Sequence, residues 1–440
     1  MTHVVSPAYT GPSMAVSWEI STLPDGLRVV TTPVPTSESV SVNVFVGAGS
    51  RGESASNMGV AHFLEHMVFK GTEKRPNAIL IAEAIEGAGG VLNAYTSKEL
   101  TCYWNHVPFD ELERAVDVLA DMLRNSLLDP EEITRESTVV QQEIKRTQDQ
   151  PGAFVGELLG RAFYGNHQMG WSTAGTEASV AALTRDDFAN WIDTWYGAPN
   201  IVLSVAGNTT HDRVMSLAER YLLDGHTAGA PNVVPLSQDT LPAEHVIGDK
   251  RPISQSNLAM GMPALARNDP DRYILMILNA VLGRGMSSRL FKEVRERRGL
   301  AYSVGSSVSR YSDGGMLGVS AGVSPEKVTE ATRVILDELD KLTQEAVPAD
   351  ELKKAIDYTV GSFRLSLEST MSLGQRAGES LLTLSEIEPV ESVVEKLRAV
   401  SSDDVLRVAQ RIVHRARTAI ALVGPEIPEE TLTEILLNGA

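Results

Sequence analysis

Apolar residues follow strand or helix spacing along most of the chain, and the same order of patterns occurs twice. The first half carries a strand pattern and then two amphipathic helix patterns, at residues 40–46, at 109–123 and from 129 onward. The second half carries a strand pattern and then three helix patterns, at residues 256–262, 272–282 and 325–339 and from 348 onward. We therefore predict the α+β fold class, with one unit used twice.

A stretch rich in Gly, Pro and small polar residues separates the two units, at residues 221–243. Such a composition at mid-chain is typical of a linker between domains, and 440 residues are too many for one ordinary core. The expected parts are a flexible N-terminus, a first domain, a linker and a second domain, at residues 1–15, 16–222, 223–244 and 245–440.

The composition is ordinary for a soluble globular protein, with 42% apolar and 22% charged residues. Asp and Glu number 57 against 39 Lys and Arg, so we expect no nucleic-acid partner and an attraction for basic peptides. Cys102 is the single cysteine, which excludes an internal disulfide and suits a reducing compartment. We interpret it as a small core residue of a strand.

The first residues lack the patterns of a signal peptide and of a transit peptide. Met14 is an alternative start, because the strand-like pattern begins only after it. The chain has no apolar run of membrane-spanning length. We therefore expect a cytoplasmic protein with no membrane partner.

The apolar segment at residues 60–69 carries polar side chains on one side only. His62, Glu65 and His66 stand at i, i+3 and i+4, which places them on one face of a helix. We expect Asn57 to cap this helix. Histidines one turn apart can bind one metal ion, as in zinc proteases with the reverse order H-E-x-x-H. The alternative is a pair of hydrogen-bonded core histidines beside a salt-bridged glutamate.

A catalytic zinc also needs a third protein ligand and an open position for water. A helix begins at Pro130, with Asp129 as its cap. Glu136 and Glu143 lie two turns apart on this helix, at the edge of its apolar stripe. Carboxylates that face a core are costly unless a cation or a donor meets them, and a zinc ion with its histidines meets both. The alternative is two glutamates along a partly exposed helix.

The motif His-Phe-Leu-Glu-His at residues 62–66, followed by Glu136 and Glu143, resembles the inverzincin, or pitrilysin-like, metallopeptidases. The layout is most similar to the catalytic subunit of mitochondrial processing peptidase and its short bacterial homologues, and the resemblance covers the chain after residue 15. It implies two homologous domains, each a mainly antiparallel β-sheet packed with helices, which enclose a cavity.

The resemblance also implies roles for the residues of the motif. His62, His66 and Glu143 would bind one Zn²⁺ per chain, and Glu136 would support the site from behind the ligands. Glu65 would be the general base of peptide-bond hydrolysis, because it cannot easily bind the same ion as its neighbour His66.

Two further segments resemble the family. Asn93 and Ala94 would hold the substrate as an added β-strand, whereas outside the family Asn93 would be a turn residue that enters a strand. Arg295 and Tyr302 would reach from the second half to the oxygen of the scissile carbonyl. Outside the family, Arg295 would be a solvated charge on a helix.

The second half lacks the zinc motif, and Lys354 and Gly361 stand where the repeat places Glu136 and Glu143. The resemblance implies a homodimer that hydrolyses peptides or unfolded polypeptides. We expect the first half, up to Tyr221, to fold and bind zinc alone. The alternatives are a catalytically silent scaffold subunit, like the core subunits of respiratory complexes with this fold, and a structural or storage zinc protein. Structural zinc sites are usually closed by four ligands, often cysteines.

Overall fold

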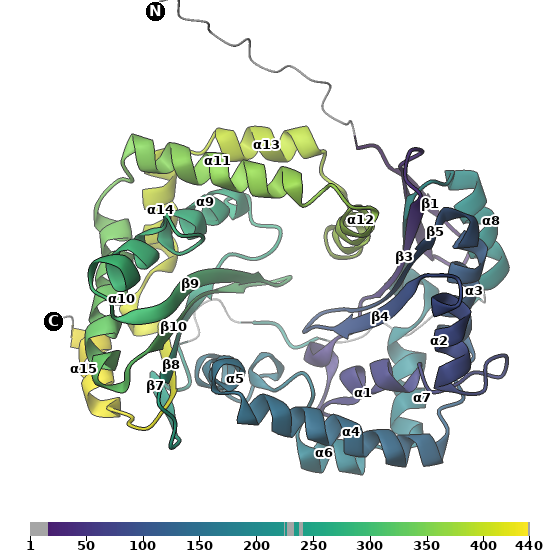
Figure 1. Ribbon diagram of the computed structural model, residues 1–440, viewed down its shortest axis with the longest axis horizontal. Helices are drawn as coiled ribbons and strands as arrows, with labels where there is room; N and C mark the ends of the chain where they lie inside the picture. Colours follow the sequence, from purple (N-terminus) through teal and green to yellow (C-terminus); the bar gives the residue numbers. More distant parts are fainter. Residues whose placement is uncertain (1–15, 224, 227–232, 237–240, 439–440) are drawn as a thin grey trace, which may run out of the picture.

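The computed structural model describes residues 16–223, 225–226, 233–236 and 241–438, which form two lobes of sheet and helices (Figure 1). The expected flexible N-terminus and parts of the expected linker lie outside these residues. None of the helices in the described ranges is both long and apolar enough to cross a membrane.

The first lobe is built on a six-stranded sheet with the order β1-β2-β6-β3-β5-β4. Its strands in chain order are β1 (Glu19–Thr22), β2 (Arg28–Pro33), β3 (Ser39–Val46), β4 (Val91–Thr96), β5 (Thr101–Pro108) and β6 (Ile201–Gly207). Strand β2 runs parallel to β6, and the other neighbours are antiparallel. Strand β4 is therefore an edge strand of this sheet.

The second lobe repeats this sheet with the order β7-β11-β8-β10-β9. Its strands are β7 (Val246–Lys250), β8 (Ser256–Ala264), β9 (Ala301–Arg310), β10 (Gly315–Val323) and β11 (Ala419–Gly424). The outer pair β7 and β11 is parallel and the rest are antiparallel, as in the series β2-β6-β3-β5-β4. The predicted repeat of one α+β unit is confirmed, and β9 is the counterpart of β4.

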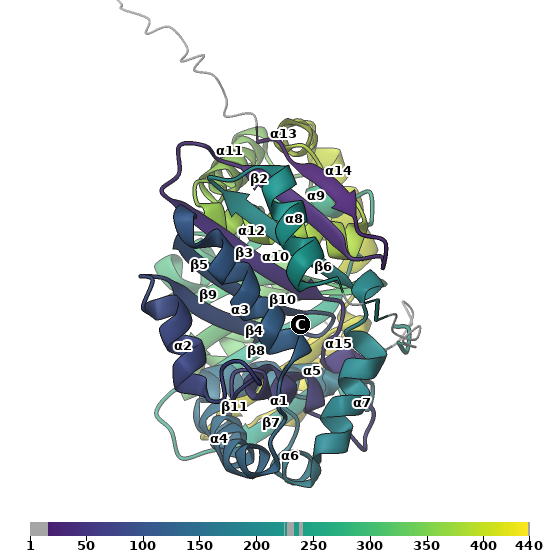
Figure 2. The same cartoon turned by 90° about the vertical axis from the view of Figure 1, so that its right-hand side faces the viewer.

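Helices surround both sheets. Those of the first half are α1 (Val60–Met67), α2 (Ala78–Glu86), α3 (Leu112–Arg124), α4 (Pro130–Asp149), α5 (Pro151–Tyr164), α6 (Glu177–Ala182), α7 (Arg185–Trp195) and α8 (His211–Tyr221). Those of the second half are α9 (Arg272–Leu282), α10 (Val328–Gln344), α11 (Ala349–Leu365), α12 (Thr370–Leu384), α13 (Val390–Arg398), α14 (Ser402–Ile412) and α15 (Glu429–Asn438). Helices α2, α3 and α8 contact the outer side of the first sheet (Figure 2).

Two helices cross from one lobe to the other. Helix α5 of the first half packs on β8 and β11, and helix α12 of the second half packs on β3 and β6 (Figure 1). Each sheet thus has one face covered by a helix from the other half of the chain. Phe45 and Val202 of the first sheet are fully buried in a cluster with Leu381 of α12.

The approach of α12 to the first sheet is close. A Cβ atom at Gly378 would lie 2.3 Å from the ring of Phe45. Because α12 comes from beyond residue 369, a fragment that ends at Tyr221 leaves the Phe45 face of the sheet in water. The fold therefore argues against our expectation that the first half folds alone.

Candidate metal centre and active site

Helix α1 presents one polar face and otherwise apolar faces. Phe63, Leu64 and Met67 are buried in the core of the first lobe, whereas His62 and His66 lie on the partly exposed side. This separation explains why an apolar helix carries imidazoles. The apolar residues anchor the helix, and the remaining face is free for chemistry.

The start of α1 differs from our prediction. Its N-cap is Gly59, with φ of 92°, and the helix begins at Val60. Asn57 instead closes the preceding turn, where its Oδ1 accepts a hydrogen bond of 2.7 Å from the backbone N–H of Ser54. The predicted Asn57 cap is wrong, because the side chain is already used in that turn and the left-handed glycine redirects the backbone.

Helix α4 provides the carboxylates. The side chain of Asp129 accepts hydrogen bonds from the first-turn N–H groups, and Pro130 is the first helical residue, as predicted. The predicted apolar stripe is buried, at Ile133, Val140 and Ile144. Helix α4 packs against α1 along this stripe, so Glu136 and Glu143 lie beside the histidines.

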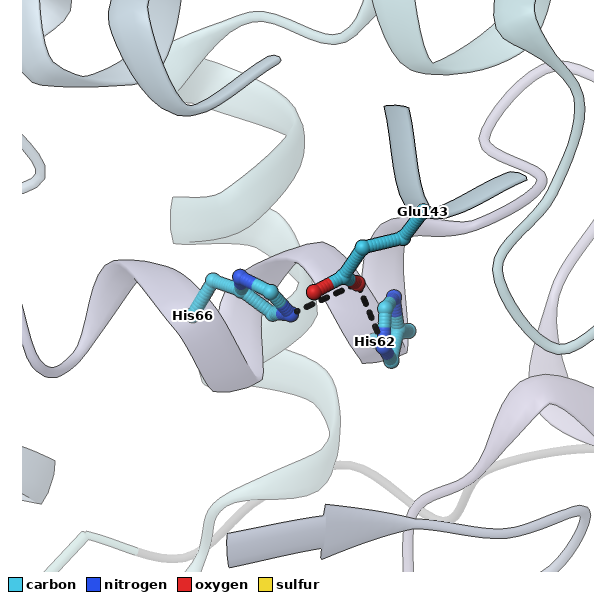
Figure 3. A group of neighbouring side chains, drawn as sticks. All are labelled: His62, His66 and Glu143. Carbon is cyan, nitrogen blue, oxygen red and sulfur yellow. Dashed lines mark ion pairs between the residues drawn. The ribbon is translucent and has the colours of Figure 1, made fainter. Parts of the chain in front are cut away.

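Three side chains converge on one point between α1 and α4 (Figure 3). A Glu143 oxygen lies 3.9 Å from Nε2 of His62 and 3.5 Å from Nε2 of His66. Tetrahedral zinc with bonds of 2.0–2.1 Å separates its ligand atoms by roughly 3.3 Å, so these distances fit a shared ion after small side-chain movements. The same three residues form the only group of three or more His, Cys, Asp or Glu of this kind in the described ranges.

The pKa of His62 fits a neutral metal ligand, whereas His66 is held by neighbouring carboxylates. Burial, together with the neighbouring His66, lowers the pKa of His62 to about 4, so the ring is neutral near pH 7. For His66, burial lowers the pKa, but the hydrogen bond to Glu136 and the nearby carboxylates outweigh it and raise the pKa. Nδ1 of His66 lies 2.9 Å from Oε1 of Glu136, which turns Nε2 toward the shared point.

Glu136 is itself held by a lysine that the sequence analysis did not assign to the site. Nζ of Lys70 lies 2.5 Å from Oε2 of Glu136, and Glu136 is only 6% exposed. Burial raises the pKa of Glu136, but the hydrogen bonds from His66 and Lys70 outweigh it and lower the pKa. Lys70 is one helical turn after His66, and this spacing was the available signal in the sequence.

Glu65 lies beside the three converging side chains and has a partner on β4. Oγ1 of Thr96 donates a hydrogen bond of 2.5 Å to Oε2 of Glu65. Burial raises the pKa of Glu65, which suits a group that gains and loses a proton. Sequence reasoning missed Thr96, which is separated from Glu65 by thirty-one positions.

The predicted substrate strand lies next to this base. Asn93 and Ala94 are on β4, the edge strand that ends at Thr96, and Asn93 is exposed. Oδ1 of Asn93 accepts a hydrogen bond of 2.8 Å from the N–H of Ala94. An open strand edge offers N–H and C=O groups that a peptide can pair with.

Arg295 and Tyr302 lie in the second lobe, on η5 (Phe291–Arg297), a π-helical segment, and at the start of β9. The guanidinium carbon of Arg295 is 5.6 Å from the ring centroid of Tyr302, which is 80% exposed. Within the described ranges, no hydrogen bond, ion pair or ring contact joins them to His62, His66 or Glu143. The chain thus brings the residues of α1 and α4 together but leaves this pair apart from them.

Comparisons with known proteins point to one peptidase family. The family model "Insulinase (Peptidase family M16)" matches residues 28–177, and "Peptidase M16 inactive domain" matches residues 182–358. An uncharacterized zinc protease of Streptomyces coelicolor is 37% identical over 412 residues, which cover 92% of this chain and 89% of that protein. An uncharacterized zinc protease of Bacillus subtilis is 36% identical over 404 residues, 92% of this chain and 97% of that protein.

Solved structures show the same fold. The crystal structure of a protease from Helicobacter pylori has a TM-score of 0.86 at 24% identity and covers 93% of this chain and all 100% of its own. A chain of Complex III2 from Candida albicans has a TM-score of 0.81 at 20% identity, with 95% of this chain and 99% of that chain covered. At these identities the likeness concerns the fold alone.

Two histidines one turn apart with a glutamate between them are the pattern of the zinc metallopeptidase motif H-x-x-E-H, and a carboxylate from the next helix lies beside the two histidines. The fold and the full-length relatives agree with that class. The chain belongs to peptidase family M16, which confirms the predicted pitrilysin-like resemblance. The closer likeness to processing peptidase stays a prediction.

Proposed function

We propose that this protein is a zinc-dependent endopeptidase that cleaves extended peptides and unfolded polypeptide segments. The observation that carries the proposal is the arrangement on α1 and α4. His62, His66 and Glu143 converge within 4.8 Å of one another, and Glu65 stands beside them without being part of the group. These three side chains would hold a zinc ion and would keep a coordination position open for water, as in catalytic zinc sites.

Zinc, when bound, acidifies a water molecule and polarises the scissile carbonyl. Glu65 accepts a proton as the water oxygen forms its bond to the carbonyl carbon. The same carboxyl group then gives that proton to the amide nitrogen as the C–N bond breaks. Thr96 holds one oxygen of Glu65, which leaves the other oxygen for this proton transfer. Lys70 and Glu136 keep His66 in its binding orientation.

The substrate class follows from the edge strand. Asn93 and Ala94 of β4 offer main-chain pairing, which requires a peptide in an extended conformation and tolerates many side chains. A folded protein cannot supply such a strand without local unfolding. The excess of acidic residues favours basic peptides.

Arg295 and Tyr302 are proposed to donate hydrogen bonds to the developing oxyanion. Among the described residues neither contacts the α1 and α4 side chains, so they would reach the oxyanion of a bound substrate either from the second lobe of the same chain or from a second subunit. The homodimer implied by the family resemblance offers the second route. We place the enzyme in the cytoplasm, where a chain with Cys102 as its single cysteine needs no oxidising environment.

The test is hydrolysis of an internally quenched, unstructured peptide. The protein purified with zinc should cleave it, a chelator should abolish cleavage, and added Zn²⁺ should restore it. The silent-scaffold alternative shares this fold, but it predicts no cleavage in any of these conditions. A structural zinc protein would unfold when the chelator removes the metal, and it would not cleave the peptide before that.

A further inference from the structure

Helix α1, which carries His62 and His66, has no side chain at its N-cap residue to cap its first turn. Helix α1 is only eight residues long, and its N-cap Gly59 offers no side chain to the N–H groups of the first turn. A Cβ atom at Gly59 would lie 2.8 Å from the backbone oxygen of Ala174, and its φ of 92° is strained for other residues. A conventional cap at this position is therefore excluded.

Glu53, six positions earlier, takes the place of that cap. Its Oε2 accepts a hydrogen bond of 2.8 Å from the N–H of Gly59, and its Oε1 accepts one of 3.0 Å from the N–H of Ala61. Glu53 is 2% exposed. A carboxylate at a helix N-terminus is stabilised by the helix dipole. Ala61 immediately precedes His62, so the bond to its N–H holds the turn from which that ligand projects.

The segment that carries Glu53 is anchored at a second place. The N–H groups of Ser50 and Arg51 donate hydrogen bonds of 3.1 and 2.8 Å to the backbone oxygens of Ser97 and Lys98. Ser97 directly follows Thr96, the residue that holds Glu65. Backbone hydrogen bonds therefore join the segment that carries Glu53 to the segment that carries Thr96.

Arg51 fixes the same segment to the second lobe. Arg51 is 3% exposed, and its guanidinium group forms ion pairs with Glu99 at 2.7 Å and with Asp313 at 2.5 Å. Asp313 lies between β9 and β10 of the other lobe. Residues 50–53 are thus held from both sides, and they provide a rigid reference for α1.

The buried carboxylate of Glu53 has a cost and a benefit. Burial raises the pKa of Glu53, whereas the N–H groups of Gly59 and Ala61 and the charge of Lys98 act in the opposite direction and favour the carboxylate. Burying such a group is costly. What it provides is a two-point attachment to α1 from outside the helix.

We propose that Glu53 is a positioning residue of the metal site, which fixes the first turn of α1 so that His62 meets His66 and Glu143 at one ion. The inference rests on the proposed zinc site, and it adds a residue that touches neither metal nor substrate. Without the two hydrogen bonds, the first turn of this short helix would fray and His62 would sample other positions.

The test compares Glu53→Gln with a matched control, Glu338→Gln. Glu338 on α10 is 4% exposed and pairs with Lys341 at 2.6 Å, so the control removes an equally buried carboxylate far along the chain from α1. Zinc affinity is measured by competition with a chromophoric chelator, and kcat and KM are measured with the quenched peptide. Glu53→Gln should weaken zinc binding by about 10- to 100-fold and lower kcat with little change in KM. The control should keep the wild-type zinc affinity, kcat and KM, whatever its effect on Tm.

Wild-type zinc affinity and kcat in folded Glu53→Gln would overturn the inference, and so would an equal loss of zinc affinity in Glu338→Gln. If Glu53→Gln does not fold, Glu53→Asp decides, because its shorter carboxylate cannot reach both N–H groups. Wild-type zinc affinity in Glu53→Asp would then refute the role, and weakened affinity would support it. Failure of the proposed function is a different result, since wild-type protein would then bind zinc without cleaving the peptide.

Discussion

The pair α1 and α4 in the first half and the pair α9 and α11 in the second half occupy equivalent places in the repeat. In both pairs the first helix packs against the second beside its own sheet. Helix α9 is buried along most of its length by apolar residues, whereas α1 keeps one polar face. On α11, Lys354 and Gly361 stand where α4 carries Glu136 and Glu143. Lys354 is exposed and lies near Asp350, and a Cβ atom at Gly361 would have no neighbouring atom within 4 Å.

The difference teaches that the proposed metal site is a small change on a shared scaffold. Two histidines and a glutamate on one helix, with two glutamates on its neighbour, would convert a helix–helix contact into a metal centre. Helices α5 and α12 each cover the sheet of the other lobe, so a cut at the linker would uncover one face of each sheet. The second half therefore packs on the lobe that carries the proposed metal site, to which it would provide no ligand.

The largest expected effect comes from removing the base that the second half lacks. Glu65→Gln should keep zinc but lose at least about 100-fold and up to about 10,000-fold in kcat, because the amide cannot accept the proton from water. Peptide hydrolysis and zinc content are measured on the same sample. Near-normal turnover in the zinc-loaded variant would remove Glu65 from the base role.

The second lobe should affect turnover without affecting metal binding. Arg295→Ala and Tyr302→Phe should each lower kcat, by up to about 100- to 1000-fold if they stabilise the oxyanion, with unchanged zinc content. Mixing Glu65→Gln chains with Arg295→Ala chains then shows which subunit supplies the pair.

If the pair acts across a homodimer, the mixture should regain activity, because one site combines an intact base with an intact arginine. If the pair acts within one chain, mixing should restore nothing. Normal activity of Arg295→Ala and of Tyr302→Phe, each measured alone, would show that neither Arg295 nor Tyr302 takes part.

The two glutamates of α4 should differ in their effect on zinc. Glu143→Gln should weaken zinc binding severely, because it removes a ligand. Glu136→Gln should weaken it by about 10- to 100-fold, because it only releases His66 and Lys70. Metal titrations by calorimetry measure both, and the reverse order would mean that the two roles are exchanged.

The smallest expected effects concern two glycines, one in close contact with a neighbouring side chain and one that faces open space. Gly378→Val should destabilise the whole chain by about 1–3 kcal/mol, because the new side chain meets the ring of Phe45. Gly361→Ala should stabilise it by about 0.4–1 kcal/mol, because it restricts the unfolded chain and meets no atom. Denaturant unfolding measures both. If Gly378→Val is neutral, α12 does not pack on the first sheet as described.

The sequence predicted the features that lie within one element or repeat along the chain. His62, Glu65 and His66 share one helix face, and the spacing of Glu136 and Glu143 follows from helix geometry alone. The order of strands and helices along each half followed from the recurrence of the patterns. These features need no knowledge of which distant segments meet.

The features that were missed depend on contacts between distant residues. The bond from Thr96 to Glu65 and the bonds from Glu53 to α1 arise only when separate segments pack together. The exchange of α5 and α12 leaves no local signal, because an amphipathic helix does not reveal which sheet it will cover. The Asn57 error was local, since a turn and a helix start compete for the same side chain.

The most direct measurement is a zinc titration of the metal-free protein while peptide hydrolysis is recorded. We expect bound zinc and the initial rate to rise together and to level off at one zinc per chain, because His62, His66 and Glu143 form a single site in the first half. Hydrolysis by the metal-free protein, or a rate that stays at zero when one zinc per chain is bound, would contradict the account.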